Sequence, residues 1–95
     1  MNYVDVIYID PAVSSKEPTD IFFDGDSAIP VWADSWKELI EVLVHTIMCN
    51  KPRLIIVDAT GAGGHICDEL CYRFKNVLAD NGSYHRHKRE YGITG

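Results

Sequence analysis

The 95-residue sequence has no long apolar segment and no sign of an export signal. No apolar run approaches the ~20 residues that a membrane-spanning helix needs. The start, from Met1 to Val6, lacks the basic region and the apolar stretch of a signal peptide. These absences argue against membrane insertion and secretion, so we expect a cytoplasmic protein without membrane contact.

Cysteine is scarce as well. The three thiols are those of Cys49, Cys67 and Cys71, all within segments of helical spacing. An odd number of cysteines in such places is typical of reduced, core-packed thiols and does not suit a disulfide framework.

Basic residues are nearly missing from the first third of the chain. Residues 1–34 hold seven acidic side chains against Lys16 alone, whereas residues 35–95 hold seven acidic and eight basic ones. The net charge of −5 argues against tight nonspecific nucleic-acid binding by the chain alone. A local nucleic-acid contact, or alternatively a solvated face, is predicted for the basic cluster near the end, which consists of Arg86, Lys88 and Arg89.

An apolar fraction of 46% and a charged fraction of 24% are ordinary for a single globular domain. Periodicity predicts strands at 3–9, 20–24, 28–32 and 54–57, and helices at 35–50 and 66–79. This β-β-β-α-β-α order indicates an α/β domain with a small mixed sheet over residues 1–82. Residues 83–95 form a basic C-terminal segment, either a last strand or a tail.

The helix at 35–50 has the clearest boundary signals. Ser35 and Glu38 match a capping box, which satisfies backbone N–H groups at a helix start. Asn50 and Pro52 end the helix, because proline cannot continue it.

Two carboxylates follow directly from predicted strands. Asp10 ends the first strand and Asp58 ends the strand at 54–57, where ligand sites of open α/β sheets gather. If these strands are neighbours, the carboxylates converge and favour a divalent cation such as Mg²⁺ or Mn²⁺. The alternative is that each aspartate caps the turn that follows it.

The turn after Asp58 is rich in glycine, with Gly61, Gly63 and Gly64 leading into the second helix. Glycines at such a turn allow backbone N–H groups to bind phosphate at a helix start. They also serve simply as a tight connection. The segment has neither the Gly-Lys-Ser/Thr of a Walker A loop nor the spacing of the dinucleotide fingerprint.

Two segments carry a family resemblance. One is Val57-Asp-Ala-Thr-Gly-Ala-Gly63, followed by Ile66 and by Asp68-Glu-Leu70; the other is Tyr8-Ile-Asp-Pro-Ala12. They resemble the second and first motifs of the nuclease domain in phage terminase large subunits, which has a ribonuclease H-like fold. The resemblance covers residues 3–78.

The resemblance implies a phage protein of the host-cell cytoplasm that acts on or near nucleic acid. It implies that Asp10 and Asp58 bind Mg²⁺ or Mn²⁺ and are the catalytic residues of a metal-dependent endonuclease. Only Glu90 lies near the place of the family's third carboxylate, so a catalytically degenerate relative is the other form of this hypothesis. Asp68 and Glu69 would replace that carboxylate only if their helix faced the site.

Zinc-type side chains occur in the second half of the chain as His65, Cys67 and Cys71, with His85 and His87 further on. Core thiols and solvated histidines are the alternative that the helical spacing favours. A nucleophilic Cys67 with a lowered pKa at the helix start is a further alternative, although the spacing identifies no base for it.

A function of a different class also fits the order of elements: a small non-catalytic module that binds a protein or a nucleotide. The order resembles that of anti-sigma-factor antagonist (STAS) domains, and small phage inhibitors of a host factor are another such kind. Here Asp58 is a turn cap. Pro30 assigns the strand at 28–32 to an edge or a bulge, and that edge could pair in a homodimer.

Overall fold

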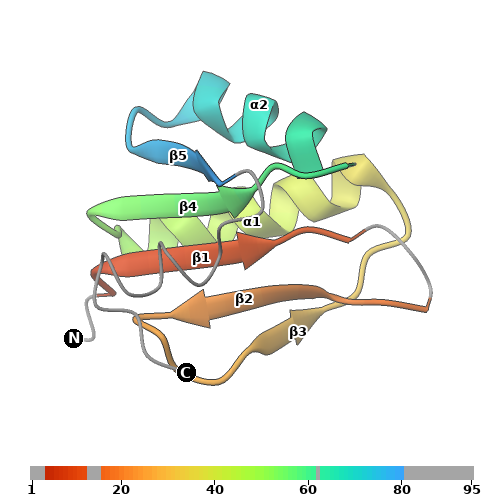
Figure 1. Ribbon diagram of the computed structural model, residues 1–95, viewed down its shortest axis with the longest axis horizontal. Coiled ribbons are helices and arrows are strands. Elements are labelled where there is room, and N and C mark those ends of the chain that lie inside the picture. The colour runs from red at the N-terminus through yellow and green to blue at the C-terminus, as the bar shows by residue number, and fades with distance from the viewer. Residues whose placement is uncertain (1–3, 13–15, 62, 81–95) are drawn as a thin grey trace.

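The computed structural model describes residues 4–12, 16–61 and 63–80. In this part of the chain, a five-stranded mixed sheet carries two helices (Figure 1). The elements are β1 (Val6–Asp10), β2 (Thr19–Phe23), β3 (Ile29–Val31), α1 (Trp36–Asn50), β4 (Leu54–Asp58), α2 (Gly63–Arg73) and β5 (Val77–Asp80). The predicted class, a small mixed α/β domain, is confirmed.

The strands lie in the order β3-β2-β1-β4-β5. β1, β4 and β5 run parallel, whereas β2 and β3 are added to β1 as antiparallel strands. The carboxyl ends of three neighbouring strands therefore meet at one edge of the sheet. Asp10, Asp58 and Asp80 end these three strands.

Both helices cover the same face of the sheet. Because side chains alternate along a strand, Ile7 and Ile9 of β1 point to the helices, as do Ile55 and Val57 of β4. A second, smaller cluster lies on the opposite face and contains Val6, Tyr8 and Ile56, with Phe22 and Leu54 packed against it. The core of the helix-covered face is completed by Leu39, Leu43 and Ile47 of α1 and by Ile66, Cys67 and Leu70 of α2.

The predicted ends of α1 are confirmed. Ser35 is the N-cap, and its hydroxyl accepts a hydrogen bond from Glu38 N at 3.1 Å. The return bond of the capping box goes to Asp34 N, which donates to Glu38 Oε2 at 3.2 Å. Lys51 closes the helix in the left-handed conformation, with φ of 46°, immediately before Pro52.

The prediction for the second helix is wrong at both ends. The helix begins at Gly63 and ends at Arg73, and residues Val77–Asp80 form β5 instead of its last turns. The side-chain amide of Asn76 donates to the carbonyls of Pro52 and Arg53, and the Asn76 carbonyl accepts from Ile55 N. These bonds align the following residues with the open edge of β4.

The hairpin around Gly25 and the edge position of β3 are confirmed, with Pro30 inside that edge strand. Ile29 and Trp32 beside it are about half exposed, at 49% and 56%. Homodimer formation through this edge stays a prediction. The predicted C-terminal segment 83–95 lies outside the described residues.

Candidate functional site

Asp10 and Asp58 lie side by side at the carboxyl edge of the sheet. β1 pairs with β4 through Ile9 and Val57, so the next residue of each strand is one of the two aspartates. Both side chains share the face of Tyr8, and with Tyr8 and Phe22 they line a cavity of about 160 Å³. The strand adjacency on which the predicted site depends is therefore present.

The environment of Asp10 is electrostatically negative. Burial raises the pKa of its carboxyl above the ordinary value, and the negative charges of Asp58, Asp20 and Glu17 raise it further. A cation placed between Asp10 and Asp58 would relieve this repulsion.

Asp58 also caps its own turn, as the alternative prediction had it. Its Oδ1 accepts hydrogen bonds from Thr60 N at 3.0 Å and from Thr60 Oγ1 at 2.7 Å. Within the described residues no hydrogen bond reaches Oδ2. One oxygen of Asp58 thus holds the turn, and the other stays available to a ligand in the cavity.

Asp80 is a third strand-end carboxylate that the sequence analysis missed. It lies in register beside Asp58 and is fully buried. Its Oδ2 accepts a hydrogen bond from the Tyr8 hydroxyl at 2.6 Å. The available signal was the run Val77-Leu-Ala-Asp80, which repeats the pattern of β4, an apolar run ending in aspartate.

Tyr8 connects this third carboxylate to the cavity. Burial raises the pKa of its phenol far above the ordinary value, and the hydrogen bond to Asp80 and the charges of Asp80, Asp58 and Asp10 add to that shift. The phenol is therefore neutral at physiological pH and acts as a fixed hydrogen-bond donor beneath the two aspartates.

The glycine-rich turn holds α2 close to the end of β4. A Cβ atom on Gly63 would collide with the carbonyl oxygen of Asp58, so this position requires glycine for close packing. Gly61 has φ of 55°, the left-handed region. The N–H groups of Gly63 and Gly64 donate to the carbonyls of Thr60 and Gly61. Phosphate binding by these glycines stays a prediction, and it would compete with bonds inside the turn.

The remaining acidic candidates do not join the site. Asp68 is exposed on α2, and Glu69 lines a different cavity on the helix side of the sheet. Across the described ranges, no group of three or more His, Cys, Asp or Glu side chains is arranged to hold a metal ion. The predicted nucleic-acid contacts Arg86, Lys88 and Arg89 lie outside the described residues, as does Glu90.

The zinc-type set does not come together in the described part of the chain. Cys67 is buried, whereas Cys71 and His65 are exposed, and all three cysteines are free thiols. Burial raises the pKa of Cys67 to about 11, with Cys71 and Asp68 contributing, so the predicted lowered pKa is wrong. His85 and His87 lie beyond the described residues.

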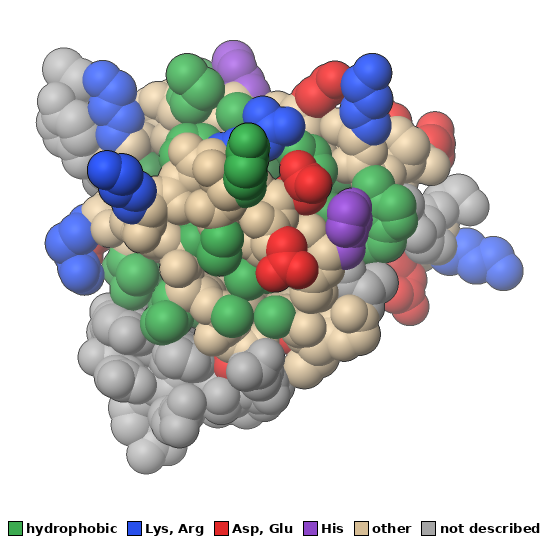
Figure 2. Space-filling view, turned by 90° about the horizontal axis from the view of Figure 1, so that it is seen from above, with side chains coloured by type: hydrophobic (Ala, Val, Ile, Leu, Met, Phe, Trp, Pro, Cys, Tyr) green, Lys and Arg blue, Asp and Glu red, His purple; other side chains and the backbone are tan. Residues whose placement is uncertain are grey.

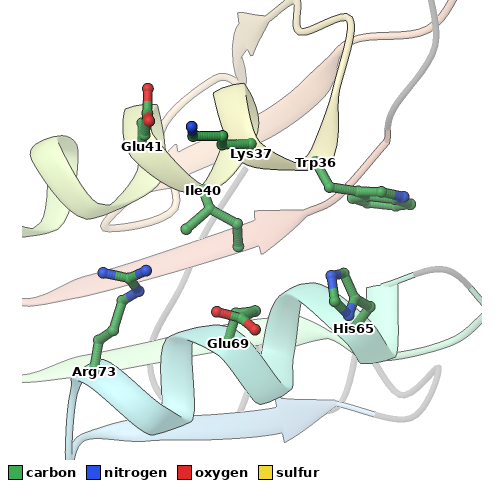
Figure 3. A pocket seen from close by; sticks show the side chains of 7 residues that line it. All are labelled: Trp36, Lys37, Ile40, Glu41, His65, Glu69 and Arg73. Atoms are coloured by element: carbon green, nitrogen blue, oxygen red, sulfur yellow. The ribbon is translucent and has the colours of Figure 1, made fainter.

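A larger cavity lies between the two helices, which cover the face of the sheet opposite to the Asp10 and Asp58 side chains. It measures about 370 Å³ and is framed by Trp36 and Ile40 of α1 and by His65, Glu69 and Arg73 of α2 (Figure 3). The rings of Trp36 and His65 meet edge to face at a centroid distance of 5.7 Å. The face seen from above in Figure 2 carries acidic, basic and apolar side chains intermixed.

Neither helix of the described chain has the length and apolar character needed to cross a bilayer. None of the protein-family models, curated proteins or solved structures compared with this chain matches it.

Proposed function

We propose that this chain is a nucleic-acid-associated protein related to the metal-dependent nuclease domain of phage terminases, with a ribonuclease H-like fold. In this proposal Asp10 and Asp58 bind one Mg²⁺ or Mn²⁺ ion. The observation that supports it is the shared cavity of these two carboxylates at the ends of adjacent parallel strands. Open α/β sheets bind ligands at this edge.

The donor set fits one hard cation. Mg²⁺ usually keeps several waters and takes one or two protein carboxylates together with substrate phosphates. Asp10 and Asp58 supply two such groups, and Oδ2 of Asp58, which accepts no hydrogen bond from the described residues, is the oxygen assigned to the ion. Among the described residues no third His, Cys, Asp or Glu side chain joins the pair, so the pair fits a single ion better than a two-metal centre.

A bound ion would polarise a phosphoryl oxygen and lower the pKa of a bound water. The residues of the chain have the other tasks. Thr60 fixes the orientation of Asp58, Tyr8 donates to Asp80 and stays neutral below the cavity, and Asp10 supplies the second carboxylate. Arg86, Lys88 and Arg89 are proposed to contact the nucleic-acid backbone.

The test is Mn²⁺-dependent nicking of supercoiled plasmid DNA, with Mn²⁺ affinity measured in parallel by calorimetry. Asp58→Asn is the sharpest variant, because an asparagine Oδ1 accepts the same two bonds from Thr60 while the charge is lost. Asp10→Asn completes the pair, and Asp68→Asn, at an exposed position of α2, is the matched control. We expect both site variants to lose Mn²⁺ binding and any nicking, with the control unchanged.

Mn²⁺ binding without nicking would favour the degenerate form of the proposal. The proposal fails if the wild-type protein binds no Mn²⁺, or if Asp10→Asn and Asp58→Asn bind it as tightly as wild type.

The second candidate is a non-catalytic binding module, either STAS-like or a phage inhibitor of a host factor. Two observations favour it: Asp58 is bonded to its own turn, and the larger cavity lies between the helices. For a nucleotide ligand, the direct measurement is a titration of the protein with ATP, monitored by the fluorescence of its two tryptophans. The binding-module hypothesis predicts that the ATP-dependent fluorescence change persists in Asp10→Asn and weakens in Arg73→Ala. The metal-site proposal predicts that this change does not depend on Arg73.

A further inference from the structure

A thiol and an imidazole lie together near the end of α1, on its exposed side. Nε2 of His45 is 3.5 Å from Sγ of Cys49, and both residues are exposed. Their four-residue spacing places them on the same side of the helix, one turn apart. Neither residue belongs to the strand-end cavity, nor to the zinc-type set read from the sequence.

The separation of these two atoms matches that of two ligands on one zinc ion. Zn–S bonds of about 2.3 Å and Zn–N bonds of about 2.0–2.1 Å, meeting at a tetrahedral angle, place sulfur and nitrogen about 3.5–3.6 Å apart. The observed 3.5 Å is therefore close to the ligated geometry already. Little side-chain movement would be needed for both atoms to reach the same ion.

The electrostatic surroundings favour a cation at this place. The carbonyl end of a helix carries partial negative charge, and the last turn of α1 contains no basic side chain, although Lys51 follows directly as the C-cap. Glu41, one turn before His45, lines the same hollow as His45, which measures about 290 Å³. Arg73 of α2 also lines this hollow and limits the attraction.

We propose that His45 and Cys49 form a two-ligand site for Zn²⁺ on the surface of α1, with water in the remaining coordination positions. Binding forms one Zn–N and one Zn–S bond and releases the thiol proton of Cys49 to solvent. With only two protein ligands, the site binds more weakly than a closed four-ligand structural site. The proposal is independent of the function assigned to Asp10 and Asp58.

The experiment is a Co²⁺ titration of the reduced 95-residue chain, monitored by the near-ultraviolet absorption that a cobalt–thiolate bond produces. Zn²⁺ is then added to displace the cobalt. The variants are Cys49→Ser and His45→Gln, with Cys71→Ser as the matched control, because Cys71 is also an exposed helical thiol. All titrations are repeated in a His85→Gln/His87→Gln background to remove the other candidate ligands.

We expect a single Co²⁺ per chain to produce the thiolate band, apart from any Co²⁺ held by Asp10 and Asp58. No thiolate band is expected in Cys49→Ser, and the affinity read from the band should be lower by roughly tenfold or more in His45→Gln. Cys71→Ser and the double histidine background should keep the band. A band that persists in Cys49→Ser, or an affinity unchanged in His45→Gln, would overturn the site. Because both residues are exposed, circular dichroism should show all variants folded.

Discussion

At the scale of single residues, a hydrogen bond from the Tyr8 hydroxyl links β1 to β5, the first and last strands of the described chain. It donates to Asp80, 72 positions further along, and both side chains are fully or almost fully buried. Buried polar groups of this kind stabilise a fold when paired and destabilise it when one partner is removed. The pair therefore stabilises the packing of β5 on the sheet and fixes the Tyr8 side chain that lines the Asp10–Asp58 cavity.

Tyr8→Phe should lower the free energy of unfolding by about 1–3 kcal/mol, because a buried carboxylate oxygen loses its donor. Urea denaturation at neutral pH measures the effect. Tyr72→Phe is the control, since Tyr72 is 90% exposed and should change the unfolding free energy negligibly. Equal stability of Tyr8→Phe and wild type would show that the bond contributes nothing.

The same tyrosine makes stability depend on alkaline pH. Its folded-state pKa is raised above the ordinary value of 10.0, so the unfolded chain releases the phenol proton first. The contribution is complete below pH 10 and is lost progressively as the pH rises above it. Wild-type protein should thus lose stability above pH 10 more steeply than Tyr8→Phe.

Asp10 affects stability in the opposite direction, because its ionised carboxylate destabilises the folded protein. Its raised folded-state pKa means that the ionised form is disfavoured in the folded protein. Asp10→Asn should therefore raise the melting temperature at neutral pH, by a free energy of at most about 1 kcal/mol because solvent screens the partly exposed group. The gain should disappear as the pH falls through the raised pKa toward the ordinary value of 3.8.

Melting curves between pH 3 and pH 8 test this, with Asp26→Asn, an exposed aspartate of the hairpin turn, as the control. A variant that gains stability at neutral pH while losing Mn²⁺ binding would show that the two carboxylates are held together at a cost in stability. A neutral-pH loss of stability in Asp10→Asn would contradict the repulsion.

At the scale of elements, the turn between β4 and α2 decides how the helix meets the sheet. Gly63 lies against the carbonyl of Asp58 and the ring of Pro11, so the helix starts directly beside the carboxyl end of β4. Nothing lies within 4 Å of a Cβ built on Gly61, although its φ is positive. The two glycines are therefore required for different reasons.

Gly63→Ala should destabilise the protein by about 3 kcal/mol or more, because the new methyl group overlaps backbone that cannot move without displacing α2. Gly61→Ala should cost only about 1 kcal/mol, the penalty of a left-handed alanine. Thermal denaturation of both variants gives the comparison. A larger loss of stability in Gly61→Ala than in Gly63→Ala would contradict the close approach of α2 to β4.

Local sequence signals determine the ends of some helices and strands but not of others. The start of α1 follows from the Ser35 and Glu38 side chains, and its end from Pro52, all of them local features. The end of α2 has no comparable local signal. Val77 and Leu78 fit both a helical stripe and a strand, and pairing with the open edge of β4 selects the strand.

At the scale of the whole molecule, one core between the sheet and the two helices carries most of the stability. Domains of this size have a net stability of only about 5–15 kcal/mol, so a single large cavity in that core removes a substantial part of it. Leu43 is fully buried there, whereas Met48, on the same helix, is 63% exposed.

Leu43→Ala should cost about 2–5 kcal/mol, and Met48→Ala less than about 0.5 kcal/mol. Chemical denaturation of both variants measures the difference. Similar losses for the two substitutions would mean that α1 packs on the sheet through another face.

The sequence by itself determined the extent of α1 and its N-cap, the strand at β4 and the edge character of β3, because each depends on neighbouring residues and on proline or glycine chemistry. Only the tertiary structure decided that β1 and β4 are adjacent, that β5 exists, and that Asp80 pairs with Tyr8. The physical reason is that strand pairing joins residues far apart in the chain, and its hydrogen bonds leave no mark on local spacing. The proposed site depends on that pairing, since it brings Asp10 and Asp58 to one cavity.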